Sequence, residues 1–420
     1  MTPKHCNWVT DGLISIFVRR SSLQKILKFS FFHDSRFKQA IDGEHYSTGT
    51  LTRRLFETRY LRFAESLTVV SRVEQARAGE TESLAVAEHP AVRFIPVNFN
   101  NPLSLFLGRH RKTITEAVAD SDFIVIRLPS LIGLSAALEA KKQNKPYMIE
   151  LVGCVFDSMW NYGSKTYRIA AGGLYAATRR AVLNAPHVIY VTEFFLQSRY
   201  PTRGEEISCS NVSLQEISKD ALQRRESKIL QGSSEDDLIL GSIGNVGLAY
   251  KGHEYVIRSL PRLVSRGLRV KYQIVGGGDQ ARLRQIADEL GVQNNVEFLG
   301  TLDHASVFEW LDSVDVYAQP SLTEGLPRAL VEAMSRGCAC IGTQTGGIPE
   351  LLEADDIVTT KAIGELSARV VEYVEDRDLR LRAAERNMQK SRAYLEETLE
   401  LRRNQFIASA LSSYRHLTDP

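Results

Sequence analysis

The sequence predicts an α/β protein with two doubly wound, Rossmann-like domains that face a central cleft. Short apolar runs, rich in β-branched and aromatic residues, alternate with longer amphipathic segments along most of the chain. The length of 420 residues suits two domains, because a typical domain has about 100 to 200 residues. A polar, charge-mixed stretch at 215–237 separates two such alternating series. Ligands of doubly wound sheets bind beyond the carboxyl ends of the strands, so the cleft is the predicted binding region.

We expect an N-terminal domain over 1–215 and a C-terminal domain over 216–394. In the first domain, the apolar runs predict strands at 25–32, 67–73, 123–128, 146–151 and 187–192, with helical patterns at 50–65 and 134–144. In the second domain, they predict strands at 238–244, 269–276, 296–300, 314–319 and 338–343, with helices at 253–266, 279–291, 304–313 and 326–336. A last charged helix is expected at 379–413, and the segment 395–420 is expected to pack back on the first domain.

The charge is unevenly distributed, although the net charge is only +2. Residues 1–215 hold 27 Lys and Arg against 19 Asp and Glu, which gives +8, and residues 216–420 hold 25 against 31, which gives −6. The basic half suits a phosphate-bearing substrate or an acidic membrane surface, and a solvated face is the plainer interpretation. The segment "TRRLFETRYLRF" is the predicted membrane contact, with the same plain alternative. No nucleic-acid partner is expected.

The five cysteines are odd in number and scattered, which indicates a reducing compartment. Cys338 and Cys340 lack a second ligand pair, so we expect core packing and no metal site. No apolar run reaches the roughly 18 to 20 residues that span a bilayer. "GLISIFV" ends in two arginines without a cleavage site, so a signal peptide is not expected. These features predict a cytoplasmic protein, with the inner face of the plasma membrane as an alternative.

The stretch "TEGLPRALVEAMSRG" predicts a helix with an anion site at its start. Pro327 suits a first helical position, and Gly337 suits the left-handed turn that ends a helix. The turn at Gly325 and Leu326 comes directly off a strand, so unpaired N–H groups and the positive end of the helix dipole lie at the carboxyl edge of the sheet. Such a helix start suits phosphate.

Two acids flank this helix start. Glu324 and Glu332 are about two turns apart, roughly 10 Å at ~1.5 Å per residue, which suits the ribose and the hexose of a nucleotide sugar. The plain alternative is that both are helix-start acids favoured by the dipole. Lys251 follows the first strand of the same sheet and could neutralise a diphosphate. Gly276 and Gly277 in "VGGGD" either allow a ligand to approach the backbone closely or form a tight turn. The motif "GGIPE" has the same order of a glycine turn, a proline and an acid.

Together, "DVYAQPSL", "EGLPRALVEAM" and "GCACIGTQTGGIPELL" resemble the retaining glycosyltransferases of family 4, also called glycosyltransferase group 1, which have the GT-B fold. The resemblance is strong over 238–355. It is weaker in the first half, where "DFIVIRLPSLIGLSAALEAKKQNKPYMIELVG" and "YVTEFFLQSRYP" are similar to an acceptor domain. The resemblance implies transfer of a hexose from a nucleotide diphosphate sugar to a glycan or lipid-linked acceptor, in the synthesis of a cell-surface polysaccharide.

The resemblance also implies a role for each residue. Glu332 would bind the ribose, and Glu324 would contact the donor hexose. The N–H groups around Gly325, Leu326 and Pro327 would hold the sugar or the distal phosphate, and Lys251 would stabilise the leaving diphosphate. No metal or other cofactor would be needed, because cationic side chains and helix ends supply the electrostatic stabilisation. The acceptor would attack the face from which the diphosphate leaves, and a phosphate oxygen would take its proton.

The sequence departs from the family pattern at two places. Asn245 stands where many members have an Arg, and Cys154 or Asp157 stands where many have a His. The loop "DGEHYSTGT" supplies Gly43, which we expect near the diphosphate, while its His45 is expected at the surface. These departures leave an alternative open, a catalytically silent protein that binds a nucleotide sugar within a glycan-assembly complex.

Overall fold

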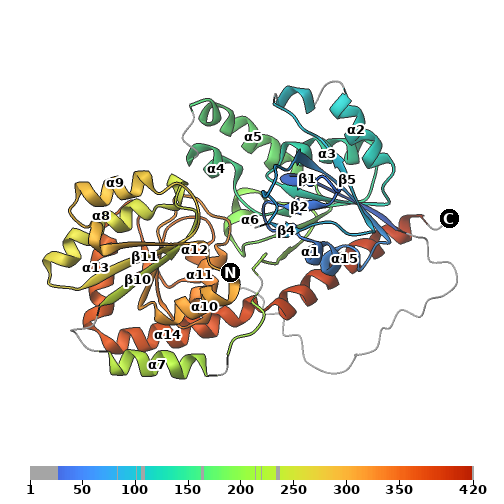
Figure 1. The fold of residues 1–420 in the computed structure, drawn as a ribbon. Helices are drawn as coiled ribbons and strands as arrows, with labels where there is room; N and C mark the ends of the chain where they lie inside the picture. The colour runs from blue at the N-terminus through green and yellow to red at the C-terminus, as the bar shows by residue number, and fades with distance from the viewer. Residues whose placement is uncertain are drawn as a thin grey trace, which may run out of the picture.

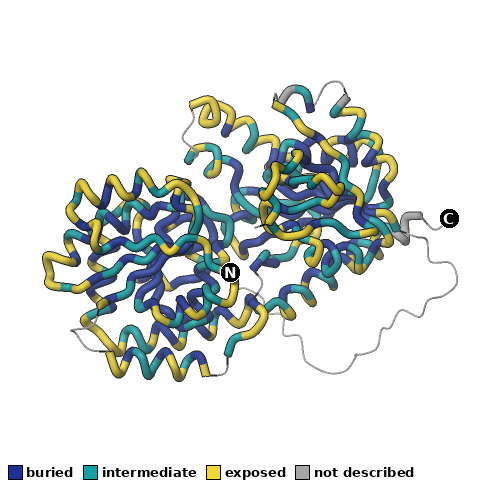
Figure 2. The backbone as a smooth tube through the Cα atoms, viewed as in Figure 1, coloured by how far each residue is buried: buried dark blue, intermediate teal, exposed yellow. Residues whose placement is uncertain are grey.

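The computed structural model describes residues 27–418, apart from 83, 101, 106–108, 162–164, 213, 219 and 233–236. Its strands form two separate sheets that lie side by side, each with helices on both faces (Figure 1). Each sheet carries its own buried core (Figure 2). Cys6, the segment "GLISIFV" and the beginning of the strand expected at 25–32 lie outside the described residues.

The first sheet has a parallel core in the order β5-β3-β1-β6-β7-β8-β9, and an antiparallel hairpin extends from β1 through β2 to β4. Its strands are β1 (Lys28–Gln39), β2 (His45–Ser47), β3 (Ser66–Gln75), β4 (Ala85–Val86), β5 (Val92–Pro96), β6 (Phe123–Leu128), β7 (Tyr147–Leu151), β8 (His187–Tyr190) and β9 (Glu205–Ser208). All five strands predicted for this domain are present. The short or charged β2, β4, β5 and β9 were not predicted, because they lack an extended apolar run.

Helices cover both faces of the first sheet. Their bounds are α1 (Arg53–Arg59), α2 (Arg109–Ala119), α3 (Leu131–Lys142), α4 (Val155–Asn161), α5 (Lys165–Leu183) and α6 (Phe195–Arg199). One core joins β6 to α2, α3 and α5, and another joins β1 to α1 and to the last helix. The helix predicted at 50–65 is much shorter than expected. It begins where the Thr52 hydroxyl accepts a hydrogen bond from the N–H of Leu55 at 3.4 Å.

The second sheet is entirely parallel, in the order β12-β11-β10-β13-β14-β15. Its strands are β10 (Leu238–Ile243), β11 (Val270–Val275), β12 (Val296–Gly300), β13 (Val316–Gln319), β14 (Ala339–Thr343) and β15 (Ile357–Val358). Its helices are α7 (Ala221–Gln231), α8 (His253–Ser265), α9 (Ala281–Glu289), α10 (His304–Ser313), α11 (Arg328–Ser335), α12 (Ile348–Leu351), α13 (Ile363–Glu375) and α14 (Arg377–Ser391). The predicted strands and helices of this domain are all present, because each has a clear pattern of hydrophobic residues and is bounded by residues that favour turns.

The polar stretch at 215–237 contains a structured helix, which the sequence analysis missed. Its helix α7 packs against α14. The buried Arg225 guanidinium on α7 donates hydrogen bonds to the carbonyls of Leu311 at 2.7 Å and Arg336 at 3.0 Å. The stretch therefore contains a helix of the second domain, which buries Ala221, Arg225 and Ile229.

The single helix expected at 379–413 is two helices. A 3-10 turn at Arg392–Tyr394 separates α14 from α15 (Glu396–Thr418), which crosses to the first sheet (Figure 1). The Cys209 thiol donates to the carbonyl of Leu399 at 3.2 Å, and Arg403 donates to the carbonyl of Ser210 at 2.7 Å. Over the described residues, no helix is long and apolar enough to cross a bilayer.

Candidate functional site

A chain of buried hydrogen bonds leads from the second sheet to Glu324. The Tyr317 hydroxyl donates to Gln319 Oε1 at 2.9 Å, and Gln319 Nε2 donates to Ser321 Oγ at 2.9 Å. Ser321 Oγ and Lys251 Nζ each donate to Glu324 Oε1 at 2.8 Å. Among the described residues, Glu324 Oε2 has no hydrogen-bond partner, so this oxygen can accept a hydrogen bond from a ligand. Gln319 and Ser321 were missed as site residues, although two polar residues at the end of a buried strand were a usable signal.

Lys251 is held against Glu324 by a tight turn after β10. The turn is a 3-10 helix at Ala249–Lys251, and Gly252 follows it in the left-handed region with φ 76°. A Cβ atom at Gly252 would lie 1.9 Å from the carbonyl oxygen of Pro320, so only glycine fits there. The side chains of Lys251 and Glu324 are only 22% and 11% exposed, which shields the ion pair from water.

The start of α11 differs from the prediction by one position. Pro327 has an extended ψ of 115° and precedes the helix, so Arg328 is the first helical residue. No side chain caps this end, so the first N–H groups of the helix stay available to an anion. Gly337 has φ 64° and ends the helix, as predicted.

A cavity of about 490 Å³ brings the main predicted residues together. Its lining residues are Ile243, Gly244, Lys251, Leu302, His304, Val307, Gln319, Glu324, Leu326, Pro327, Arg328, Ala329 and Glu332. Burial raises the pKa of Glu332, and Arg328 and His304 oppose this shift. No described side chain hydrogen-bonds the Glu332 carboxylate. A partly buried carboxylate without a hydrogen-bond partner at a cavity wall indicates a ligand-binding position.

Three predicted residues shape the loops behind this cavity and do not line it. Gly276 has φ 146°, and a Cβ atom there would lie 2.1 Å from the carbonyl oxygen of Gly244. The Gly277 carbonyl accepts the N–H of Val246 at 3.0 Å. Asn245 Oδ1 accepts the N–H of Gly247 at 2.9 Å. These contacts hold the loops after β10 and β11 together.

Gly43 is not brought into this cavity. The pairing of β1 with β6 ends at Phe32, but β1 continues to Gln39 before the turn that contains Gly43. The turn thus follows an extension of the strand, beyond the carboxyl edge of the parallel core. The expectation of a surface His45 is wrong, because its ring stacks on Phe94 at 4.1 Å between centroids and its side chain is only 12% exposed.

In the first domain, the two residues that stand where many members have a His are engaged with neighbouring side chains. Cys154 is buried, with Sγ 3.2 Å from the Tyr200 hydroxyl. Asp157 forms an ion pair with Arg199 Nη1 at 2.8 Å. Cys209, Cys338 and Cys340 are also free and buried, as expected of core cysteines. In the part of the chain that the structure describes, no cluster of three or more His, Cys, Asp or Glu could hold a metal ion.

Two contacts bring the domains together beside the site. A Cβ atom at Gly325 would lie 2.3 Å from the carbonyl oxygen of Val152, which follows β7. The Glu350 carboxylate on α12 accepts the N–H groups of Glu193, Phe194 and Phe195 at 2.6, 2.9 and 2.6 Å, directly before and at the start of α6. The acid of "GGIPE" is evident in the sequence, but its partners lie in the other domain, more than 150 residues away in the chain.

Comparison with known proteins agrees with this architecture. Residues 223–390 match the family described as glycosyl transferases group 1. The chain is 30% identical over 397 residues to protein CapJ of Staphylococcus aureus, which covers 93% of this chain and 96% of CapJ. It is 37% identical over 112 residues to the putative colanic acid biosynthesis glycosyltransferase WcaL of Escherichia coli, which covers 25% of this chain and 28% of WcaL.

Among solved structures, the fold is similar to Anabaena HepE, which was crystallised in complex with UDP. The TM-score is 0.64 at 18% identity, and the match covers 92% of this chain and 100% of HepE. This likeness identifies the fold as GT-B, in agreement with the prediction. The chain belongs to the group 1 glycosyltransferases.

Proposed function

We propose that this protein is a retaining, metal-independent glycosyltransferase that moves a hexose from a nucleotide diphosphate sugar to a glycan or lipid-linked acceptor. The observation that carries the proposal is the cavity shared by Lys251, Glu324 and the unpaired Glu332. HepE was also crystallised with UDP-glucose, which makes a UDP-sugar our first candidate donor. The printed name of WcaL supports a role in the synthesis of a cell-surface polysaccharide.

The donor would lie along the start of α11. The Glu332 carboxylate would accept hydrogen bonds from the ribose hydroxyls, and Glu324 Oε2 would accept one from the hexose. The first N–H groups of α11 and the ammonium of Lys251 would bind the diphosphate. Lys251 already contacts Glu324 at 2.8 Å, so a small rotation of its side chain would bring the ammonium to a phosphate oxygen.

The chemistry would need no general base from the first domain. An acceptor hydroxyl would attack the anomeric carbon on the face from which the diphosphate leaves, and a departing phosphate oxygen would take the hydroxyl proton. The new glycosidic bond would form as the bond from carbon to phosphate oxygen breaks. The pairing of Asp157 with Arg199, and of Cys154 with Tyr200, fits a reaction in which neither acts as a base. Lys251 and the helix start would stabilise the charge on the leaving group.

A catalytically silent donor-binding protein is the second candidate. It is favoured by Asn245, whose side chain is engaged within its own loop where many members have an Arg. The two candidates differ in turnover. A glycosyltransferase should slowly hydrolyse its donor when no acceptor is present, with loss of hydrolysis in Glu324→Gln. Tight donor binding with no hydrolysis and no transfer would favour the silent protein.

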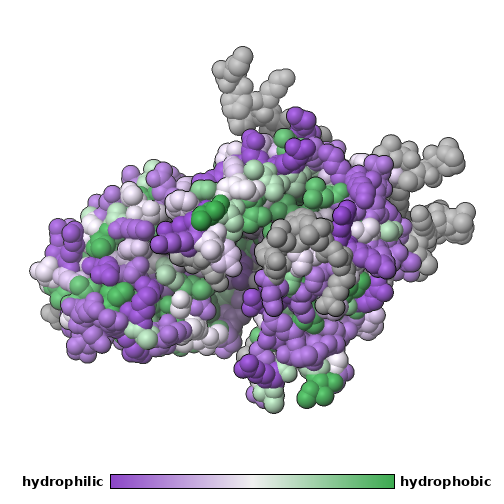
Figure 3. All heavy atoms as spheres, turned by 90° about the horizontal axis from the view of Figure 1, so that it is seen from above, coloured by the Kyte–Doolittle hydropathy of each residue, from purple (hydrophilic) through white to green (hydrophobic). Residues whose placement is uncertain are grey.

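We also propose that the first domain contacts a membrane, but through α4 and α5 instead of α1. The expected contact at α1 does not fit the structure, because Phe56 and Tyr60 are fully buried. Helix α5 contains no Asp or Glu, and its basic residues include the exposed Arg179 and Arg180. Near its start, Ile169 is 84% exposed. Figure 3 looks down on this side, where hydrophobic atoms lie at the surface among polar ones.

A basic surface with exposed apolar side chains suits an anionic bilayer, which would place the enzyme at the cytoplasmic face of a membrane. Sedimentation with phosphatidylglycerol vesicles tests this. The double variant Arg179→Glu/Arg180→Glu should bind them less than the wild type, and neither should bind phosphatidylcholine vesicles. The control Arg266→Glu/Lys361→Glu reverses two exposed charges in the second domain and should bind as the wild type does. Equal binding by the two double variants would exclude this surface.

The donor assignment is tested by thermal unfolding with nucleoside diphosphates and their sugars. A ligand that binds only the folded state raises the unfolding temperature. A rise with a nucleoside diphosphate in the wild type, and none in Glu332→Gln, is the expected result. If no nucleotide raises the unfolding temperature, the proposed function is wrong.

A further inference from the structure

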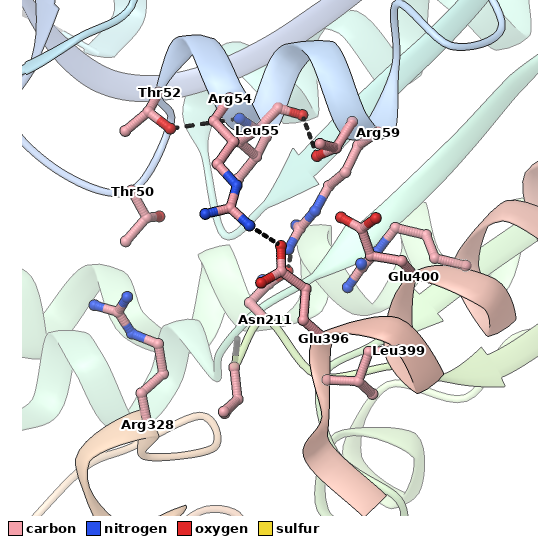
Figure 4. A pocket seen from close by; sticks show the side chains of 13 residues that line it. Thr50, Thr52, Arg54, Leu55, Arg59, Asn211, Arg328, Glu396, Leu399 and Glu400 are labelled. Atoms are coloured by element: carbon pink, nitrogen blue, oxygen red, sulfur yellow. Dashed lines mark hydrogen bonds and ion pairs between the residues drawn. The ribbon is translucent and has the colours of Figure 1, made fainter. Parts of the chain in front are cut away.

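A second cavity lies between the domains, beside the two chain segments that connect them (Figure 4). Its volume is about 150 Å³. The walls come from α1 and the loop before it, from the first connecting segment, from α15 and from the first residue of α11. The lining residues are Thr50, Thr52, Arg54, Leu55, Thr58, Arg59, Asn211, Val212, Arg328, Glu396, Leu399, Glu400 and Arg403.

Two buried arginines form part of this cavity. Arg59 is 8% exposed and donates to Asn211 Oδ1 at 2.7 Å, and Arg403 is 2% exposed and donates to the Ser210 carbonyl at 2.7 Å. Both acceptors are neutral, and neither guanidinium forms an ion pair among the described residues. Burial, and then the nearby Arg403, lowers the pKa of Arg59 to about 10. The buried Glu150 carboxylate attracts both guanidinium groups but forms no ion pair with either, so their charge is only partly compensated, which is costly for the folded protein.

The whole lining has an excess of positive charge. Four arginines and two glutamates give 4 − 2 = +2. Glu396 is engaged with Arg54 at 2.7 Å, as Figure 4 shows, while no described side chain pairs with Glu400. An oxyanion would offset this charge, and guanidinium groups bind phosphate and carboxylate oxygens well.

This cavity meets the donor cavity at one residue. Arg328 lines both cavities and is exposed, and its side chain makes no hydrogen bond or ion pair with any described residue. A group bound here would therefore lie beside the proposed donor. In a transfer reaction the acceptor must occupy such a neighbouring position, because the two reacting groups have to approach each other closely.

We propose that this cavity binds an oxyanion of the acceptor, either the phosphate of a lipid-phosphate or the carboxylate of an acidic sugar. Arg54, Arg59 and Arg403 bind the oxyanion, and the Thr50 hydroxyl donates a further hydrogen bond at the mouth. Glu400 opposes binding by charge repulsion and so limits the affinity. The inference rests on the proposed function and adds to it a chemical property of the acceptor.

Calorimetric titration tests this with the full-length protein saturated with UDP, so that the donor cavity is occupied. The probes are glucose 1-phosphate, glucuronate and neutral glucose. Arg54→Gln should weaken binding of the preferred anion about three- to tenfold, while Arg53→Gln, on the same helix but outside the cavity, should not. Glu400→Gln should tighten binding by a similar factor, and the matched Glu397→Gln should leave it unchanged.

A gain of affinity in Glu400→Gln cannot result from unfolding. This variant therefore tests the proposal even if an arginine variant folds poorly. A preference for glucose 1-phosphate identifies a phosphate-bearing acceptor, and a preference for glucuronate identifies an acidic glycan. Equal binding of glucose and both anions, or no difference between Glu400→Gln and Glu397→Gln, would overturn the inference. Failure of UDP itself to bind would instead count against the proposed UDP donor.

Discussion

The two domains differ in how the polar groups expected at the site are engaged. On the second domain, Glu324 is oriented by three donors on one oxygen, while its other oxygen and the whole Glu332 carboxylate have no described partner. On the first domain, Asp157 is already paired with Arg199, and Cys154 contacts Tyr200. Polar groups that are held in place but lack a hydrogen-bond partner can bind a ligand. Polar groups that are already paired mainly stabilise the fold. The second domain is therefore the side on which we propose that the donor binds.

The largest expected effect is on Glu324. Glu324→Gln keeps the size of the side chain but removes the charge beside Lys251, so we expect transfer to fall about 10²-fold or more. Steady-state transfer with a UDP-sugar measures this. Glu353→Gln, an exposed neighbour outside the cavity, serves as the control and should retain full activity. Wild-type turnover in Glu324→Gln would remove this residue from the site.

Gly325→Ala tests the contact between the domains. The new methyl group would lie 2.3 Å from the Val152 carbonyl oxygen, so the two domains must separate locally. We expect transfer to fall roughly 10- to 100-fold through misplacement of the acceptor side, with donor affinity nearly unchanged. Calorimetry and transfer assays together separate these effects. Gly172→Ala, at a position with nothing within 4 Å, should alter neither.

Glu350→Ala removes the carboxylate that joins the second domain to α6. Three backbone N–H groups lose their acceptor, but Glu193 and Phe194 are exposed, so water replaces part of the loss. We expect about 1 kcal/mol less stability and a wider distribution of domain orientations. Chemical denaturation and small-angle X-ray scattering measure these two changes. A variant with unchanged scattering and stability would show that this contact does not hold the domains together.

Acidification should act on both domains through buried histidines, and at lower pH on the first domain through Glu150. Burial lowers the pKa of His33 in the first domain to about 3. Burial lowers the pKa of His253 in the second domain to about 4. The unfolded chain, with a His pKa near 6.5, binds this proton more readily, so stability falls as the pH drops from about 6.5 to 4. In the first domain, burial alone would raise the pKa of Glu150, but Arg127 lowers it to about 2. Its contribution is lost only between about pH 4.5 and 2.

Denaturation at a series of pH values measures these contributions. In His253→Gln, the free energy of unfolding should depend less on pH between pH 6.5 and 4. The loss of stability over this range should be smaller by about 1.4 kcal/mol for each unit of the removed pKa shift. The slope below pH 4 should not change. An unaltered slope above pH 4 would show that His253 is not one of the responsible groups.

The sequence predicted that Lys251, Glu324 and Glu332 lie close together, and the cavity of the second domain brings them together, because their determinants are local. Lys251 and Glu324 lie in the loops that follow recognisable strands, and Gly337 ends a helix with clear periodicity. The acceptor side depends on segments far apart in the chain, such as Arg59 and Arg403, which meet only when α15 crosses back. Nothing in their neighbourhood in the sequence distinguishes these arginines from surface ones.

The difference between local and long-range determinants also explains the wrong predictions for Gly43 and for the stretch at 215–237. Gly43 was expected at the carboxyl edge of the sheet, because the extension of β1 to Gln39 carries charged residues that do not read as a strand. The stretch at 215–237 was taken as a boundary because its charges mask the apolar stripe of α7, which only the packing against α14 makes visible. Contacts between domains, such as that of Glu350, leave no periodic signal.

The central claim is that the cavity with Lys251, Glu324 and Glu332 holds a nucleotide sugar. Calorimetric titration of a panel of nucleotide sugars, UDP-glucose first, into the wild type, Glu332→Gln and the control Glu353→Gln tests it most directly. We predict that one nucleotide sugar binds the wild type and the control with equal affinity, and that it binds Glu332→Gln at least about tenfold more weakly. Equal affinity in all three proteins, or no binding of any nucleotide sugar, would contradict the claim.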